Sequence, residues 1–202
     1  ALVIEPGMSF SNNGIITPNF KNLKKISEFS RNNNIFFEAH STDYQPIGVL
    51  KKLVNSNFKF LKVGPELTFQ FNECIKYMLN IEKKFIPKKK DRSNLKEDLI
   101  SVMNKNPKYW KSYYKGSKSN INYLKFNSPL DRIRYYWDNK KIKNSKKKLF
   151  KNINKLPINL VLKSKKINNI YHHNFKKYKI KNSELLILKF TNQTFQKYYK
   201  AC

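Results

Sequence analysis

The first 85 residues repeat one pattern three times: a short apolar run, a turn signal, and then an amphipathic stretch. The apolar runs are short and rich in branched or aromatic residues, which is typical of buried strands. They cover residues 1–4, residues 35–37 with Glu38 at the end, and residues 58–63. Three strand–helix units in succession predict parallel strands joined by right-handed crossovers. The predicted fold class is therefore α/β, either a doubly wound sheet or part of a (β/α)8 barrel.

The stretches after these runs place apolar side chains three or four residues apart, the spacing of one helix face. We expect helices after Pro18, after Pro46 and after Gly64-Pro65. No G-x-G-x-x-G follows any of the three runs, so a dinucleotide-binding fold has no support in the sequence.

From residue 86 onward the strand signal fades and the pattern becomes helical. Polar residues and prolines that suit helix starts precede four amphipathic stretches. These starts are at Ser93, Pro107, Ser128-Pro129 and Ser183. We therefore divide the chain into residues 1–85, which carry the βα units, and residues 86–202, a mainly helical extension packed on them.

The chain carries 42 Lys and Arg against 13 Asp and Glu, a formal net charge of +29. Such a charge suggests nucleic acid as a partner. However, the excess is almost entirely lysine, spread among asparagines over every predicted element, whereas specific recognition favours the planar fork of arginine. Because Lys and Asn codons are AT-rich, we favour compositional drift and expect no specific nucleic-acid binding.

The sequence has no run of about 18 apolar residues, which predicts no membrane-spanning helix. Its first residues lack the basic start and apolar centre of a signal peptide, and the chain begins without Met, as a fragment would. Cys74 and Cys202 show neither metal-ligand nor disulfide spacing. We expect a cytoplasmic protein, present here as a fragment.

Polar and charged side chains gather where the three predicted strands end. They are Glu5 after the first strand, Glu38, His40, Ser41 and Asp43 after the second, and Lys62 and Gly64 after the third. Ligands of α/β folds meet the carboxyl ends of the strands. We therefore expect one common site at this edge of the sheet.

Each of these residues has a structural alternative. Glu38 and His40 are two apart on a strand and share a face, so they could share a proton or a metal; one histidine makes no metal site, and the spacing alone favours a hydrogen bond to a loop. Lys62 could hold a phosphate or form an imine, or pair with Glu5 or Glu38. Gly64 could expose backbone amides to a phosphate, or only permit a turn.

Two further clusters lie in the predicted extension. One combines arginines with aromatic residues, as the centres of protein interfaces do. Its members are Arg132, Arg134, Tyr135, Tyr136 and Trp137. The alternative, that this helix simply packs on the βα units, is favoured. The pair His172-His173 is interpreted as a loop and not as a ligand set.

Several motifs together resemble one known family. They are E-A-H-S-T-D-Y-Q at residues 38–45, L-K-V-G-P at residues 61–65, P-x-Y-W-x-x-Y-Y at residues 107–114 and D-R-I-R-Y-Y-W at residues 131–137. In this order they resemble the non-catalytic subunit of D-tagatose-1,6-bisphosphate aldolase, the GatZ/KbaZ family. The lysine-rich residues 163–168 depart from the more apolar family pattern.

The resemblance implies the last three βα units of a (β/α)8 TIM barrel, followed by an α-helical C-terminal extension on the barrel. It implies an accessory, chaperone-like subunit without activity of its own, which supports a class II aldolase in galactitol or amino-sugar catabolism. That aldolase cleaves tagatose 1,6-bisphosphate to dihydroxyacetone phosphate and glyceraldehyde 3-phosphate. Zinc would belong to the partner catalytic subunit, although His40 stands where a class II aldolase places a zinc ligand. The alternative is a zinc-dependent aldolase or sugar-phosphate enzyme in its own right.

Overall fold

The computed structural model of the chain describes residues 1–162 and 180–202. The His172-His173 pair and the lysine-rich residues 163–168 lie outside these ranges. The strands are β1 (Leu2–Ile4), β2 (Ser9–Ser11), β3 (Gly14–Ile16), β4 (Phe37–Ala39) and β5 (Phe58–Leu61). The longer helices are α1 (Phe20–Asn32), α2 (Ile47–Asn55), α3 (Pro65–Phe85), α4 (Leu95–Lys105), α5 (Lys118–Asn127), α6 (Lys140–Asn154) and α8 (Asn182–Tyr199). The short elements are α7 (Ile158–Val161) and three 3-10 helices, η1 (Lys89–Asp91), η2 (Pro107–Tyr109) and η3 (Arg132–Tyr136).

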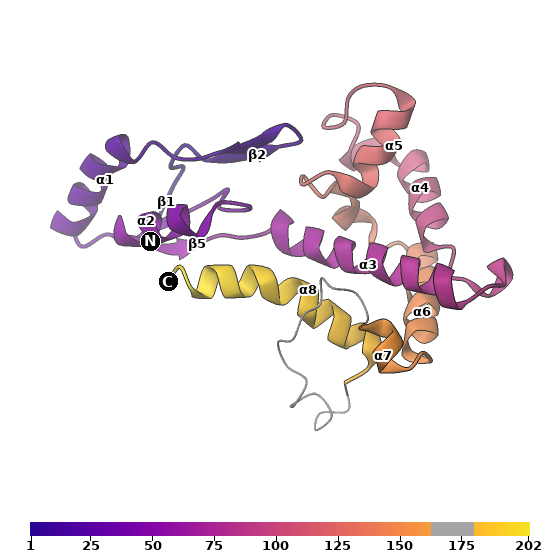
Figure 1. The fold of residues 1–202 in the computed structure, drawn as a ribbon. Coiled ribbons are helices and arrows are strands. Elements are labelled where there is room, and N and C mark those ends of the chain that lie inside the picture. The colour runs from indigo at the N-terminus through magenta and orange to yellow at the C-terminus, as the bar shows by residue number, and fades with distance from the viewer. Residues whose placement is uncertain (163–179) are drawn as a thin grey trace. The chain divides into compact units, whose positions relative to one another are not determined.

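The described residues form two compact units. We call Ala1–Phe69 with Gln193–Cys202 the sheet unit, and Gln70–Asn192 the helical unit. Both long helices α3 and α8 contribute to each unit (Figure 1). The contacts thus divide the chain within α3, whereas the sequence analysis divides it at residue 85. The boundary at residue 85, between βα units and a helical extension, stays a prediction.

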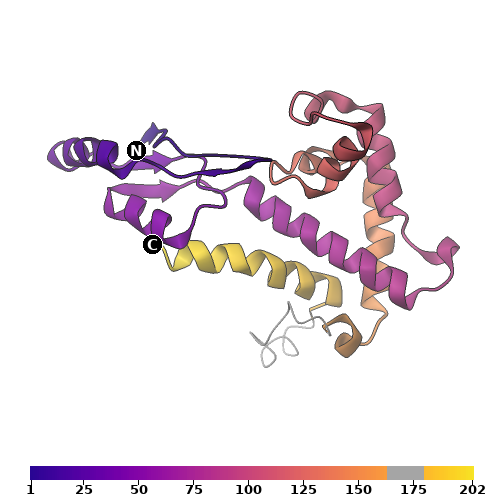
Figure 2. The same ribbon diagram turned by 45° about the horizontal axis from the view of Figure 1, so that its top comes forward.

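The sheet unit is built on a three-stranded parallel sheet in the order β1-β4-β5 (Figure 2). This confirms the predicted α/β class with parallel strands and intervening helices. One face of the sheet buries Phe37, Ala39 and Phe58 against Leu50 and Leu53 of α2, and all five are 0% exposed. The aromatic rings of Phe37 and Phe58 fill this space, and aromatic residues are favoured in strands.

A small antiparallel hairpin, β2 with β3, was missed by the sequence analysis. It occupies the stretch between the first strand and α1. Its strands have three residues each, and Gly14 lies at the turn with a φ of 149°. Strands this short show little alternation of apolar and polar residues, but the Asn13-Gly14 dipeptide is a typical hairpin turn from which the hairpin could have been predicted.

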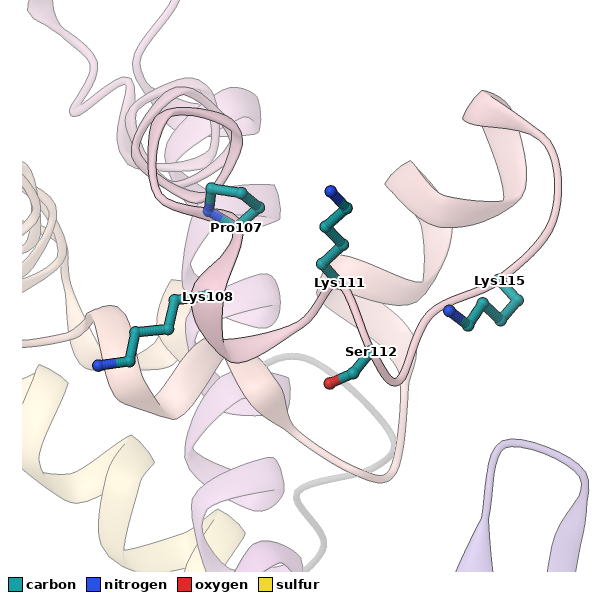
Figure 3. Close-up of a pocket in the computed structure, with 5 residues that line it drawn as sticks. All are labelled: Pro107, Lys108, Lys111, Ser112 and Lys115. Carbon is teal, nitrogen blue, oxygen red and sulfur yellow. The ribbon is translucent and has the colours of Figure 1, made fainter.

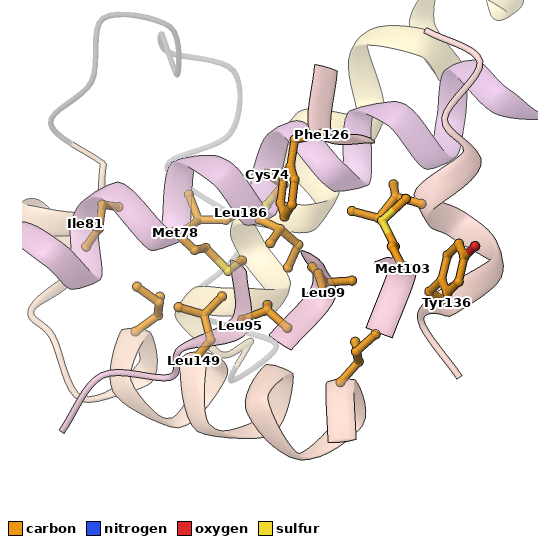
Figure 4. Packing of buried hydrophobic residues seen from close by; sticks show 14 of the residues in the cluster. Cys74, Met78, Ile81, Leu95, Leu99, Met103, Phe126, Tyr136, Leu149 and Leu186 are labelled. Atoms are coloured by element: carbon orange, nitrogen blue, oxygen red, sulfur yellow. The ribbon is translucent and has the colours of Figure 1, made fainter. Parts of the chain in front are cut away.

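The helical unit packs α3, α4 and α6 with part of α8 around one apolar core (Figure 4). Cys74, Met78 and Ile81 come from α3, and they meet side chains of α4 such as Leu95 and Leu99. The buried carboxylate of Glu82 holds the end of α3 to the start of α4. It accepts from the Ser93 amide at 2.9 Å and from the Ser93 hydroxyl at 2.7 Å.

The predicted helices of the tail are confirmed in part. Helix α4 and helix α8 form as expected, although Asn94 and not Ser93 directly precedes α4. The predicted helix from Pro107 is wrong in extent, because only the 3-10 turn η2 forms there. The amides of Tyr113 and Tyr114 both bond back to the carbonyl of Trp110, which ends the regular backbone pattern.

The helix predicted from Ser128-Pro129 is also shortened, to the 3-10 helix η3. Two helices were missed, α5 and the lysine-rich α6. Helix α6 buries Ile142, Leu149 and Ile153 and exposes most of its lysines. Within the described ranges, no helix is long and apolar enough to cross a membrane.

Candidate functional site at the strand ends

The loop that follows β4 holds three of the residues predicted for a site, His40, Ser41 and Asp43. Its backbone is unusual, because Ser41 and Tyr44 adopt left-handed φ angles of 58° and 63°. Left-handed conformations of residues other than glycine cost free energy and persist where surrounding contacts enforce them. The contacts described next provide that enforcement.

Glu38 and His40 lie side by side, as the strand alternation predicts. The Nε2 atom of His40 is 2.8 Å from Oε1 of Glu38, and the two side chains are 30% and 32% exposed. A carboxylate at this distance can accept a proton from the ring or fix its tautomer. The hydrogen bond therefore runs between the two side chains and not from His40 to a loop carbonyl.

Asp43 caps the start of α3. Its Oδ1 atom accepts hydrogen bonds from the amide of Gly64 at 2.9 Å and from the amide of Glu66 at 2.8 Å. The side chain is 3% exposed, and this burial raises the pKa of the Asp43 carboxyl although the two amide bonds act to lower it. Asp43 thus occupies the amides that the sequence analysis offered to a phosphate at Gly64.

Glu66 is the centre of a buried network that the sequence analysis missed. Its carboxylate lies 2.5 Å and 2.7 Å from the ammonium of Lys197 and accepts from the amide of Tyr44 at 2.6 Å. The hydroxyl of Thr194 lies 3.4 Å from the same carboxylate. The last turns of α8 are therefore bonded to the first turn of α3.

Tyr198 provides a second link between α8 and the loop. Its hydroxyl donates to the carbonyl of Thr42 at 2.9 Å and lies 2.9 Å from the Thr42 hydroxyl, which donates to the carbonyl of Lys62 at 2.7 Å. Burial raises the pKa of the Tyr198 hydroxyl above its usual range. Sequence separations of 131 and 156 residues gave no signal from which these partners could be predicted.

Glu5 and Lys62 do not join this group. Both are exposed, and among the described residues neither forms an ion pair with the other or with Glu38. The proposed pairing of Lys62 is therefore not part of the structure. Gly64 has no left-handed φ, and a Cβ atom there would meet nothing within 4 Å, so neither the turn nor crowding requires glycine.

The described part of the chain does not offer a complete zinc site. It contains no group of three or more His, Cys, Asp or Glu side chains able to hold a metal ion. A zinc site in proteins uses at least three such ligands. His40 and Glu38 face one another, and Asp43 is committed to backbone amides, so these residues do not fit a zinc ion by themselves.

Comparison with known proteins identifies the family. Residues 1–202 match the family described as D-tagatose-1,6-bisphosphate aldolase subunit GatZ/KbaZ-like. The chain belongs to this GatZ/KbaZ-like family. It is 37% identical over 163 residues to the D-tagatose-1,6-bisphosphate aldolase subunit GatZ of Klebsiella pneumoniae subsp. pneumoniae, which covers 80% of this chain and 38% of that protein. The resemblance inferred from the motifs is confirmed.

The fold of this GatZ/KbaZ-like chain is also similar to a solved structure. The crystal structure of a probable tagatose 6 phosphate kinase from Sinorhizobium meliloti 1021 matches 99% of the chain with a TM-score of 0.83 and 29% identity. The match covers 52% of that protein. The chain therefore spans about half of the structural relative and 38% of the length of the curated relative.

The cluster of Arg132, Arg134, Tyr135, Tyr136 and Trp137 lies in the helical unit of this GatZ/KbaZ-like chain. The sequence left open a partner surface there and favoured internal packing. Tyr136 is only 3% exposed and belongs to the core, and Trp137 packs edge-on against Phe71 at 5.3 Å. These two residues are therefore removed from the predicted surface. Tyr135 remains 44% exposed.

Tyr113, which lies outside the predicted cluster, contacts Arg132 of that cluster. The Arg132 guanidinium lies over the ring of Tyr113 at 3.7 Å and over the ring of Tyr135 at 4.8 Å. Tyr113 is 46% exposed. The Arg134 guanidinium also lies over the Tyr135 ring, 4.5 Å from its centre. We call Tyr113, Arg132, Arg134 and Tyr135 the arginine–tyrosine stack.

Proposed function

We propose that this GatZ/KbaZ-like chain serves as an accessory, non-catalytic part of a class II tagatose-1,6-bisphosphate aldolase, stabilising the catalytic subunit in galactitol or amino-sugar catabolism. The family membership and the identity to a GatZ subunit support the proposal. Because the chain spans 38% of that relative, the role is that of one portion of the subunit.

The proposal rests on one observation, namely that the buried carboxylates near the strand ends are bonded to partners within the chain. Asp43 and Glu66, the buried carboxylates of this region, are satisfied by backbone amides and by the Lys197 ammonium. A group that acts on substrate needs a free lone pair or proton directed at a ligand. Carboxylates that are already bonded within the chain instead hold the loop after β4 and the start of α3 in place. This is consistent with a stabilising subunit.

The exposed face of the sheet supports the proposed barrel architecture. Val3, Glu38 and Phe60 are in register on neighbouring strands, and Val3 and Phe60 are 52% and 53% exposed. Within the described residues, β1 and β5 each pair on one side only. Unpaired edges and exposed apolar faces are normally covered. Further strands closing a (β/α)8 barrel would cover both.

We propose that the arginine–tyrosine stack is the surface of this chain that binds the catalytic subunit. Tyrosine and arginine dominate the energetic centres of interfaces, and stacked rings lose little conformational entropy when a partner binds. Arg132 is additionally held by donating from Nε to the carbonyl of Tyr109 at 2.7 Å. The stack is therefore ordered before a partner arrives.

The test is co-purification of the chain with the catalytic subunit, followed by measurement of aldolase activity after warming. We expect a stable complex and slower loss of activity than for the catalytic subunit alone. Tyr135→Ala combined with Arg132→Ala should weaken the complex at least about tenfold, a typical hot-spot loss. The exposed Tyr123→Ala is the matched control and should leave binding unchanged. Absence of both binding and protection rejects the accessory role.

A second candidate function, an aldolase or sugar-phosphate enzyme acting through Glu38 and His40, has one observation in its favour. The pair is partly exposed and in hydrogen-bond contact, the arrangement of a general base with its orienting group. Turnover of tagatose 1,6-bisphosphate by the purified chain that is lost in His40→Ala supports this candidate. A catalytically silent chain with unchanged partner binding in His40→Ala supports the accessory role.

A further inference from the structure

The end of α8 is bonded to the loop that follows β4, although the two segments are far apart in the sequence. Ala201 is buried in the same apolar cluster as Leu50 and Leu53 of α2, and the C-terminus lies beside this helix (Figure 1). The last turns of α8 therefore pack within the sheet unit, where their polar side chains reach the loop.

Tyr198 supports the first half of this loop. Ser41 has a left-handed φ angle, which residues other than glycine adopt only where contacts enforce it. The next residue, Thr42, is 0% exposed, and its carbonyl and its hydroxyl each lie 2.9 Å from the Tyr198 hydroxyl. The Thr42 hydroxyl in turn donates to the carbonyl of Lys62, which fixes the loop to the end of β5.

Lys197 supports the second half of the loop. Tyr44 is the other left-handed residue, and its amide donates to Oε2 of Glu66 at 2.6 Å. The Lys197 ammonium lies 2.7 Å from the same oxygen. An acceptor that is buried and charged keeps its position only while its counter-charge is present. Both left-handed parts of the loop are therefore held, directly or through one residue, by the end of α8.

The placement of His40 depends on this loop. Glu38 lies within β4, which is paired on both sides, by β1 and by β5. His40 follows the last residue of β4 and directly precedes the left-handed Ser41. The carboxylate of the Glu38–His40 pair is therefore fixed by the sheet, whereas the imidazole is fixed by the loop.

A surface hollow of the helical unit shows no comparable set of contacts. The side chains of Lys108 and Lys115, two of the residues that line it, extend in different directions (Figure 3). Their ammonium groups do not converge on one point, so the hollow does not define a ligand site.

We propose that Lys197 and Tyr198 are positioning residues for the strand-end site. Tyr198 acts on the loop through Thr42. Lys197 acts on it through the Glu66 carboxylate. Together they keep the loop in the conformation that places the His40 ring, and detachment of the last turn of α8 would release both. The inference concerns the sheet unit alone and does not depend on whether the chain is accessory or catalytic.

The next two residues of the chain provide matched controls. Tyr199 is 80% exposed, and Lys200 is exposed. The test variants are Tyr198→Phe and Lys197→Met, which keep the ring or the aliphatic stem and remove the polar group. The controls are Tyr199→Phe and Lys200→Met, which make the same chemical changes on the exposed side of the same turn. Circular dichroism and melting curves show whether each variant is folded.

Two NMR measurements on the full chain report on the loop. Hydrogen exchange of the Tyr44 amide reports how often the loop opens. The ring nitrogen signals of His40, assigned with His40→Gln, report whether its Nε2 atom stays bonded to Glu38. A role in general stability alone would not change the second measurement in a folded variant.

We expect Tyr198→Phe to accelerate exchange of the Tyr44 amide about fivefold, the effect of one net hydrogen bond, and to move the His40 signals toward those of an unbonded ring. Lys197→Met, which strands a buried carboxylate, should accelerate the exchange about tenfold or more. Both controls should stay within about twofold of the parent.

Thr42 offers a second, conservative pair of variants. Thr42→Val keeps the shape and removes the hydroxyl, so it should reproduce the change of the His40 signals, whereas Thr42→Ser keeps the hydroxyl and should retain the parental signals. Equal changes in a test variant and its control would overturn the proposal. So would parental His40 signals in folded Tyr198→Phe, since α8 would then contribute only general stability.

Discussion

The helical unit and the sheet unit are each stabilised internally, but by different kinds of interaction. Among the described residues, the helical unit buries 15 hydrophobic side chains in one cluster, and the sheet unit buries eight. The sheet unit instead relies on long-range polar bonds, in which Glu66 and Thr42 hold the end of α8. Apolar burial tolerates small shifts in geometry, whereas a buried polar network loses much of its worth when one partner is removed.

This contrast also concerns what each unit leaves uncovered. The sheet unit exposes Val3, Phe60 and the hairpin residue Ile16, the last at 60%. The exposed aromatic residues of the helical unit, in contrast, are in part ordered by stacking with arginine. The helical unit therefore has a closed apolar core, whereas the sheet unit leaves apolar side chains of its sheet and hairpin exposed.

Leu99→Ala should produce the largest loss of stability. Leu99 is fully buried in the core of the helical unit, and truncating a buried leucine costs about 2–5 kcal/mol. Urea unfolding followed by tryptophan fluorescence measures this directly, since Trp110 and Trp137 both lie in that unit. Leu188→Ala, at a side chain that is 48% exposed, serves as the control. A loss in Leu99→Ala no larger than in the control would mean that this core is loosely packed.

Glu66→Ala tests the polar network of the sheet unit. The substitution leaves the Lys197 ammonium and the Tyr44 amide without their acceptor, which should cost about 2–3 kcal/mol, because Lys197 is 20% exposed and partly screened. Hydrogen exchange should accelerate in residues 40–45 and 193–202. Glu73→Ala removes only a surface pair with Lys76 and should cost less than about 0.5 kcal/mol. Unchanged exchange in Glu66→Ala would show that the network contributes little.

Two substitutions of Asp43 distinguish the stabilisation from its hydrogen-bond acceptor from the cost of its buried charge. Asp43→Ala strands the amides of Gly64 and Glu66 and should cost about 1–3 kcal/mol. Asp43→Asn keeps an acceptor oxygen and removes the charge, so it should be far milder. Chemical unfolding of the two variants measures the difference. Equal losses would show that the charge, and not the acceptor, is what the site requires.

The pH dependence of Asp43 follows from the direction of its shift. Burial raises the folded-state pKa of this carboxyl above the unfolded value of 3.8. A raised folded pKa stabilises the protein below the unfolded pKa, and this contribution is lost as the pH rises through the folded pKa. The parent chain should therefore lose stability relative to Asp43→Asn as the pH is raised from about 3.8 upward, a change that unfolding curves at several pH values would reveal.

The sequence predicted the sheet unit better than the helical unit, for a physical reason. Its strands carry dense branched and aromatic runs bounded by turn residues, and parallel order follows from the alternation with helices. In the helical unit, α6 was missed although Ile142, Leu149 and Ile153 stand at the spacing of one helix face, so this helix could have been predicted from the sequence. The turns η2 and η3 depend on side-chain bonds to distant carbonyls, which no local pattern encodes.

The candidate site also contains both features that local sequence predicts and features that depend on distant parts of the chain. Strand alternation predicted that Glu38 and His40 share a face, but the hydrogen bond between them was not the favoured alternative. The capping role of Asp43 needed knowledge of where α3 begins relative to the loop. The contacts of Lys197 and Tyr198 depend on the path of α8 back to the strand ends, and chain topology of this kind is not a local property of sequence.

The smallest effect is expected at Lys125, a buried cation of the helical unit. The side chain is 3% exposed, its ammonium lies 4.1 Å from the Trp110 ring centre, and it donates to Asn104 and Asn122. Burial lowers the pKa of Lys125 below 10.5. A lowered folded pKa of a lysine means that stability present above the unfolded pKa is lost as the pH falls through the folded value.

At neutral pH the charge of Lys125 is therefore a cost. Lys125→Met, which keeps the stem and removes the charge, should leave the free energy of unfolding unchanged or raise it by up to about 1 kcal/mol, since both asparagines are exposed and can bond to water. The advantage should shrink as the pH approaches 10.5, whereas Lys147→Met on the exposed face of α6 should show no such trend. A clear loss of stability in Lys125→Met would mean that the two asparagine bonds and the indole contact outweigh desolvation, so that polar bonds stabilise this unit too.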